Sequence, residues 1–192
     1  DVWLVSETEG AGEGLEGQQV AWVHHSELGN YQFPDANRPI LRAAQLPDLY
    51  TISYDVSAFD TLDAWLYYHT QNVAPDAWLY VRVPTLAPDA QPALILQLQQ
   101  QRPDLKLVIS AALYELNLPV AGYHLRHADL ATYTALPRHD ERQLWFASVH
   151  NADSIQAADA LGVDAMLLGA VLPTESHPEQ TGIGWKAFEQ LA

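Results

Sequence analysis

Ser148 ends an apolar run over residues 143–148 that is typical of a buried strand, and His150 follows two residues later. An imidazole can give or take a proton near neutral pH, and a position just past a strand is open to a ligand. His150 is therefore the first candidate for a catalytic acid or base. The alternative is an exposed loop histidine without a chemical role.

Arg82 interrupts a second apolar run, residues 79–83. If this run is a strand, the guanidinium points into a barrel interior or against helices. A buried guanidinium needs an anion to offset the cost of removing it from water. We therefore expect Arg82 to bind a phosphate or carboxylate group.

Two histidines and an aspartate surround the end of a third run, residues 120–125. His124 and His127 are three residues apart, a spacing that can hold a metal on a helix. However, His124 belongs to a predicted strand, and no third ligand is evident. Asp129 can serve a site, or it can favour the start of a following helix through the helix dipole. Both interpretations of Asp129 stay open.

The charge balance limits the partners of this chain of 192 residues. It carries 24 acidic and 9 basic side chains, a formal net charge of −15. Such a field repels nucleic-acid polymers and anionic membrane surfaces, but it allows a small anion in one locally basic pocket. There is no cysteine and no apolar run of about 20 residues, so we expect no membrane span and a cytoplasmic location.

The candidate residues fall on a regular alternation of predicted strands and helices that starts at Leu49. The strands are expected over residues 49–54, 77–83, 105–110, 120–125, 143–148 and 164–169. The helices are expected over residues 59–72, 91–101, 111–116, 128–135 and 151–161. This alternation is typical of an α/β fold with a parallel sheet. Six such units predict a (β/α)8 TIM barrel truncated after about six units, with its site at the carboxyl ends of the strands.

Specific motifs lie in the second part of this alternation. They are the triplet Ser148-Val149-His150, the stretch over residues 160–178, the stretch Gly182-Ile183-Gly184-Trp185 and the strand Gly122-Tyr123-His124-Leu125. Through them the chain from about residue 49 to 192 resembles the thiamine phosphate synthase/TenI family. The resemblance implies a barrel of that type that handles thiazole phosphate in thiamine metabolism.

Members of this family catalyse one of two reactions, which need different groups in the active site. The synthase joins a pyrimidine diphosphate to thiazole phosphate with Mg²⁺, whereas TenI relatives tautomerise the thiazole. The resemblance implies that His150 transfers the proton and that Asp129 is a metal position. It also implies phosphate or substrate binding by Arg82, Ser148, Thr174 and His177.

Several positions depart from the synthase pattern. Ser110-Ala111-Ala112 replaces an Asn-Asp-Arg motif, Pro84 and His177 replace lysines, and Tyr80 replaces a glutamine. A departing diphosphate needs cations and a protein-bound metal ion to offset its charge. These replacements remove most of the residues that would bind the Mg²⁺ that the family implies. A TenI-like proton-transfer or binding role is favoured. An active synthase and a catalytically silent binding or scaffolding barrel are the alternatives.

The first 47 residues do not follow this alternation of strands and helices. A Gly/Glu-rich loop leads into Glu16-Gly17-Gln18, and the motif over residues 33–40 follows, with short strands expected over 1–6 and 19–23. These motifs are similar to the C-terminal part of a MutT-type Nudix hydrolase, a partial α+β domain. The resemblance implies that Asn37 binds an oxidised guanine base and that Glu16 lies near a metal. Asn37 can instead cap the helix that follows.

Together the two resemblances imply a bifunctional enzyme with a Nudix remnant over residues 1–47 and a thiazole phosphate barrel over 48–192. The Nudix helix that carries the metal ligands is not in the sequence, so we expect no hydrolase activity from this segment alone. Neither end carries a start or capping signal, and we interpret the chain as a piece of a longer protein. The expected partners are thiazole phosphate and a nucleoside triphosphate, and a homo-oligomer stays open.

Overall fold

The computed structural model describes residues 5, 7–10, 12–140, 142–173 and 182–192. The chain forms two compact units, Asp1–Leu46 and Pro47–Ala192. None of the helices in these described ranges has the length and apolar character that crossing a membrane requires.

The first unit contains the 3-10 helices η1 (His25–Asn30) and η2 (Asp35–Asn37) and the helix α1 (Arg38–Gln45). Pro39 stands in the first turn of α1, where its missing N–H costs nothing. The strand expected over residues 19–23 is wrong, because this stretch has no regular secondary structure. A strand needs a hydrogen-bonded neighbour, and the described residues of this unit provide none. Most of the other expected strand, residues 1–6, lies outside the described residues.

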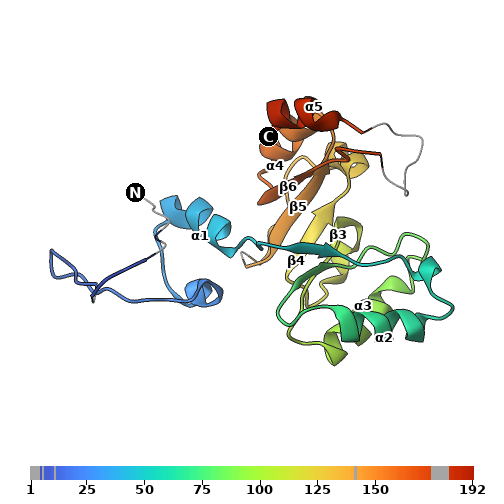
Figure 1. Cartoon of the computed structure of the whole chain (residues 1–192), viewed down its shortest axis with the longest axis horizontal. Coiled ribbons are helices and arrows are strands. Elements are labelled where there is room, and N and C mark those ends of the chain that lie inside the picture. The colour runs from blue at the N-terminus through green and yellow to red at the C-terminus, as the bar shows by residue number, and fades with distance from the viewer. Residues whose placement is uncertain (1–4, 6, 11, 141, 174–181) are drawn as a thin grey trace. The chain divides into compact units, whose positions relative to one another are not determined.

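The second unit contains one sheet of six parallel strands, each paired with the next along the chain (Figure 1). The strands are β1 (Tyr50–Ile52), β2 (Trp78–Tyr80), β3 (Lys106–Ser110), β4 (Gly122–Leu125), β5 (Leu144–Val149) and β6 (Ala165–Leu168). Five lie within the runs that the sequence predicts as strands, and β5 extends one residue beyond its predicted run, to Val149. This confirms an α/β fold with a parallel sheet.

Helical segments follow the strands, and all of them except η3 and α5 overlap a range that the sequence predicts as helical. They are η3 (Val56–Ala58), α2 (Leu62–Asn72), α3 (Gln91–Gln101), η4 (Ala111–Leu116), η5 (His127–Thr132), α4 (Ala152–Leu161) and α5 (Gly184–Leu191). Local chemistry sets several ends. The Thr61 side chain accepts a hydrogen bond from the N–H of Ala64, and Asn151 and Ser154 form a reciprocal capping box.

The segment over residues 128–135 differs from its prediction as an α-helix, since only the 3-10 turn η5 forms. The Thr132 hydroxyl donates to the carbonyl of Asp129 at 2.7 Å, a local bond that competes with helical hydrogen bonding.

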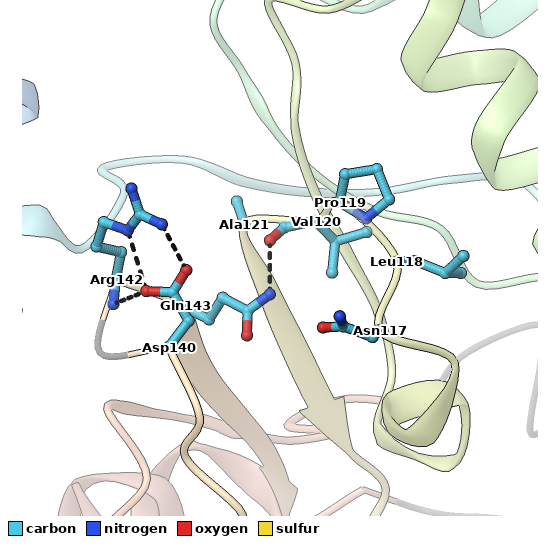
Figure 2. Close-up of a pocket in the computed structure, with 8 residues that line it drawn as sticks. All are labelled: Asn117, Leu118, Pro119, Val120, Ala121, Asp140, Arg142 and Gln143. Atoms are coloured by element: carbon cyan, nitrogen blue, oxygen red, sulfur yellow. Dashed lines mark hydrogen bonds and ion pairs between the residues drawn. The ribbon is translucent and has the colours of Figure 1, made fainter.

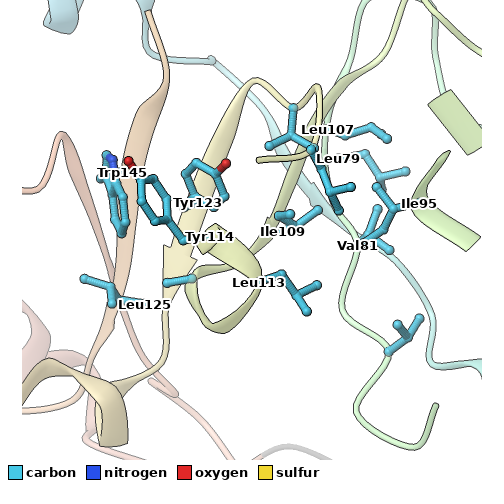
Figure 3. Packing of buried hydrophobic residues seen from close by; sticks show 14 of the residues in the cluster. Leu79, Val81, Ile95, Leu107, Ile109, Leu113, Tyr114, Tyr123, Leu125 and Trp145 are labelled. Atoms are coloured by element: carbon cyan, nitrogen blue, oxygen red, sulfur yellow. The ribbon is translucent and has the colours of Figure 1, made fainter. Parts of the chain in front are cut away.

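One face of the sheet forms the main hydrophobic core with the helices. Leu79, Leu107, Tyr123 and Trp145 alternate with inward-facing residues along their strands and are almost fully buried. Figure 3 shows these side chains lying among those of η4 and α3. Trp65 of α2 is completely buried in the same cluster.

Aromatic contacts on the opposite face show that the sheet is curled. The rings of Tyr50 on β1 and Phe146 on β5 have centroids 4.7 Å apart. Since neighbouring strands are about 4.8 Å apart, these two strands would be about 19 Å apart in a flat sheet. The curl and the strand order make the sheet a half-barrel, consistent with the first six strands of a TIM-type barrel.

Gly122 allows two strands to pass closely inside this half-barrel. A Cβ atom at this position would lie 2.4 Å from the carbonyl oxygen of Leu144 on β5. Since that contact is with backbone, no side chain fits here without separating β4 from β5.

Arg102 fastens the end of α2 to the segment that leads into β3. Its Nη1 group donates to the carbonyls of Thr70 and Val73 at 2.8 and 3.0 Å. Its Nε and Nη2 groups donate to Asp104 at 2.8 and 2.6 Å. A guanidinium therefore satisfies carbonyls that the helix end leaves without partners.

Replacing Arg102 with alanine should lower the free energy of unfolding by about 1.5–3 kcal/mol, the size expected for hydrogen bonds to a charged group. Urea unfolding followed by circular dichroism measures this loss. Arg142→Ala is the matched control, because Arg142 pairs with Asp140 two residues away but is highly exposed. Equal losses in both variants would contradict a fastening role for Arg102.

Candidate functional site

The carboxyl ends of the parallel strands bring several predicted residues to one rim of the half-barrel. Arg82 lies two residues after β2, Ser148 is near the end of β5, and His150 directly follows β5. Asp129 lies in η5, just beyond β4. Because all strands run in one direction, these positions share the same end of the sheet.

A hydrogen-bonded chain of three side chains lies on the inner face. The Tyr50 hydroxyl is 2.9 Å from Nδ1 of His124, and Nε2 of His124 is 2.7 Å from the Ser148 hydroxyl. The ring of Tyr80 is stacked on the imidazole, with centroids 4.3 Å apart and planes 13° apart. The chain joins β1, β4 and β5. Tyr50 and Tyr80 were not among the residues expected from the sequence.

Burial keeps this chain uncharged. The His124 side chain is 2% exposed, and burial lowers the pKa of its imidazole to about 4, helped by the positive charge of Arg82. Burial raises the pKa of the Tyr50 phenol well above its usual range, and the neighbouring Tyr80 adds to that effect. At neutral pH His124 is therefore a neutral imidazole between two neutral hydroxyl groups.

Arg82 is exposed, so the expectation that its guanidinium is buried is wrong. Its strand is short and ends at Tyr80, which leaves Arg82 at the open rim. Only its backbone is fixed, since its N–H donates to the Ser53 hydroxyl at 3.0 Å and its carbonyl accepts from that hydroxyl at 3.3 Å. No hydrogen bond or ion pair holds the guanidinium within the described part of the chain. Its charge nevertheless acts on His124 and Tyr80.

His150 is exposed, and a backbone group orients its ring. Its Nδ1 hydrogen-bonds to the carbonyl of Gly169, just past β6. Because a carbonyl can only accept, Nδ1 carries the proton and the neutral ring keeps its lone pair on Nε2. The ring of His127 lies beside it, with centroids 4.8 Å apart. This arrangement suits a general base.

The Asp129 carboxylate is held by Arg126. Arg126 donates from Nε and Nη2 to the two carboxylate oxygens at 2.7 and 2.8 Å. His124 and His127 do not form a pair of metal ligands, because His124 bonds to Tyr50 and Ser148 while His127 lies against His150. Within the described ranges, no three His, Asp or Glu side chains group as they would around a metal ion.

The remaining predicted residues are elsewhere. Thr174 and His177 lie outside the described residues. Glu16 and Asn37 belong to the first unit, where Glu16 is exposed. Asn37 stands at the start of α1, but its side chain makes no capping hydrogen bond there.

A cavity of about 520 Å³ lies at the other end of the strands (Figure 2). It is lined by residues just before β4, including Asn117 and Val120, and by residues just before β5, including Arg142 and Gln143. The Gln143 amide donates to the Val120 carbonyl at 3.1 Å. Since barrel sites lie at the opposite end of the strands, we assign the candidate site to the rim with Ser148 and His150.

A comparison with known protein families shows to which family this chain belongs. The family model described as thiamine monophosphate synthase matches residues 91–192, more than half of the chain. The chain belongs to the thiamine monophosphate synthase family. No curated protein and no solved structure matches it. Residues 1–90 lie outside the matched stretch, and the Nudix resemblance of the first unit stays a prediction.

The match to the thiamine monophosphate synthase family includes His124, Asp129, Ser148 and His150 but not Arg82. The Mg²⁺ that this family implies does not fit the described rim. Asp129 has both carboxylate oxygens bonded to a guanidinium, and the position that should carry the second aspartate is Ala111, which is buried. Neutral aliphatic and ion-paired groups are poor ligands for a hard cation.

Proposed function

We propose that the half-barrel unit binds a thiazole phosphate and transfers a carbon-bound proton on it, as TenI relatives do, and that it does not make thiamine phosphate. The observation that carries this proposal is the contrast between His150 and Asp129. His150 has an oriented ring with a lone pair on Nε2, whereas the Asp129 carboxylate is already bonded to Arg126.

Tautomerisation needs little from the protein. A proton leaves one ring carbon and returns at another position, so no group is lost and no diphosphate charge develops. One base near neutral pH and one cation for an anionic end of the ligand are enough. Nε2 of His150 supplies the base, and the Arg82 guanidinium supplies the cation.

The purified protein should therefore bind a thiazole phosphate in calorimetry and convert one tautomer to the other. It should not form thiamine phosphate from the pyrimidine diphosphate, with or without Mg²⁺. Formation of thiamine phosphate at a normal rate would contradict the proposal. If there is neither binding nor conversion, the barrel is a silent appendage.

Arg82→Ala should raise the Kd for the thiazole phosphate by about 10- to 100-fold, as expected for the loss of a charge-assisted hydrogen bond. Arg82→Lys should recover part of the affinity because it keeps the charge. Isothermal titration calorimetry measures both. Arg142→Ala, which removes a cation at the other end of the strands, should leave the Kd unchanged. An unaltered Kd in Arg82→Ala would remove Arg82 from the site.

A further inference from the structure

The hydrogen-bond direction along the chain from Tyr50 through His124 to Ser148 can be worked out from its geometry. A neutral imidazole donates from one nitrogen and accepts at the other. With hydroxyl groups at 2.9 Å from Nδ1 and 2.7 Å from Nε2, only two arrangements satisfy both contacts. They differ in which hydroxyl is left with a free hydrogen.

In the first arrangement the Tyr50 hydroxyl donates to Nδ1, and Nε2–H donates to the Ser148 oxygen. The free hydrogen then belongs to Ser148. In the second arrangement Ser148 donates to Nε2, Nδ1–H donates to the Tyr50 oxygen, and the phenol hydrogen of Tyr50 needs another acceptor.

The surroundings of Tyr50 oppose the second arrangement. Its ring contacts those of Tyr80, His124 and Phe146, and its hydroxyl has no hydrogen-bond partner besides His124 in the described part of the chain. A hydroxyl that is enclosed by these rings and cannot donate loses free energy, whereas Ser148 lies near the end of β5, where its hydroxyl can donate to a ligand at the rim.

We infer that Tyr50 and His124 are positioning residues that leave the hydrogen of the Ser148 hydroxyl free to donate to the ligand. This inference rests on the proposed function for the identity of the ligand. It also favours a ligand with an acceptor atom at Ser148, because one lone pair of the Ser148 oxygen is used by His124 and the hydroxyl hydrogen has no partner. Together with the guanidinium of Arg82 on the same rim, this favours a carboxylate or phosphate oxygen over an amine or amide N–H.

The orientation can be tested in the free protein. In protein labelled with ¹⁵N-histidine, two-bond proton–nitrogen correlation spectra distinguish the two tautomers. Burial lowers the pKa of both His124 and His69, so the signal of His124 is assigned as the one of these two that remains in a His69→Asn variant. We expect it to carry its proton on Nε2. A proton on Nδ1 would overturn the inference.

Variants then test the hydrogen bonds that link Tyr50, His124 and Ser148. Tyr50→Phe removes the donor to Nδ1 and should move the His124 proton to a mixture of the two nitrogens. The KM for the thiazole phosphate should rise about 5- to 30-fold with little change in kcat. Ser148→Ala should raise KM similarly, and the double variant should be no worse than Ser148→Ala, since both changes remove the same bond.

Tyr80→Phe is the matched control, because this ring stacks on His124 but its hydroxyl makes no hydrogen bond to the imidazole. It should leave the His124 tautomer unchanged. Additive effects of Tyr50→Phe and Ser148→Ala would overturn the inference. A proton on Nε2 in a protein that binds no thiazole phosphate would support the orientation of Ser148 while contradicting the proposed function.

Discussion

Replacing His150 with alanine should lower the rate of proton transfer on a thiazole phosphate by about 10²–10⁴-fold, as expected for the loss of a general base. The Gly169 carbonyl holds the His150 proton on Nδ1 and leaves the Nε2 lone pair for the substrate. Binding should change little, since we propose that Arg82, and not His150, binds the anionic end of the ligand. Single-turnover kinetics, with the Kd measured separately by calorimetry, distinguish the two effects.

His127→Ala is the control for this experiment. The two imidazoles lie side by side at the rim, but no carbonyl fixes the proton of His127 in the described structure. We expect the rate in His127→Ala to fall far less than in His150→Ala. Equal losses would mean that the two rings act as one unit, and an unchanged rate in His150→Ala would make it an ordinary loop residue.

The sequence predicted the half-barrel well because each unit repeats one local pattern. A buried parallel strand is a short apolar run, and a covering helix has an apolar stripe. Both patterns are visible within about a dozen residues. The stretch over residues 19–23 shows the limit of this reasoning. It has strand-like composition, but pairing depends on a neighbour that sequence alone does not place.

The candidate site was only partly predictable for a similar reason. Ser148 and His150 carry chemical groups at the end of a strand, and this position reveals them. Tyr50 gave no such signal, because a tyrosine in an apolar strand usually packs. Its role depends on the curl that brings β1 within reach of β4 and β5. Arg126, which occupies the Asp129 carboxylate, was missed because ion pairing depends on side-chain conformation.

His124 should also make the stability of the protein depend on mildly acidic pH. The pKa of its imidazole is about 4 in the folded protein and 6.5 in the unfolded chain. Stability from the neutral ring is thus fully present above pH 6.5 and is lost as the pH falls from about 6.5 to 4. The difference corresponds to about 3 kcal/mol. Burial also lowers the pKa of His69, which adds to the loss in the same direction.

Carboxylates affect stability at lower pH than the histidines do, so the two contributions can be measured separately. The pKa values of Asp55 and Asp104 are about 2, so the stability they give is lost mainly below pH 4. Urea unfolding between pH 7 and 4 should therefore show a steep fall for the wild type and a shallower one for His124→Asn. If His124→Asn does not fold, NMR titration of His124 in the wild type gives the same answer. A His124 ring that protonates near pH 6.5 would contradict the neutral chain on which the donor role of Ser148 depends.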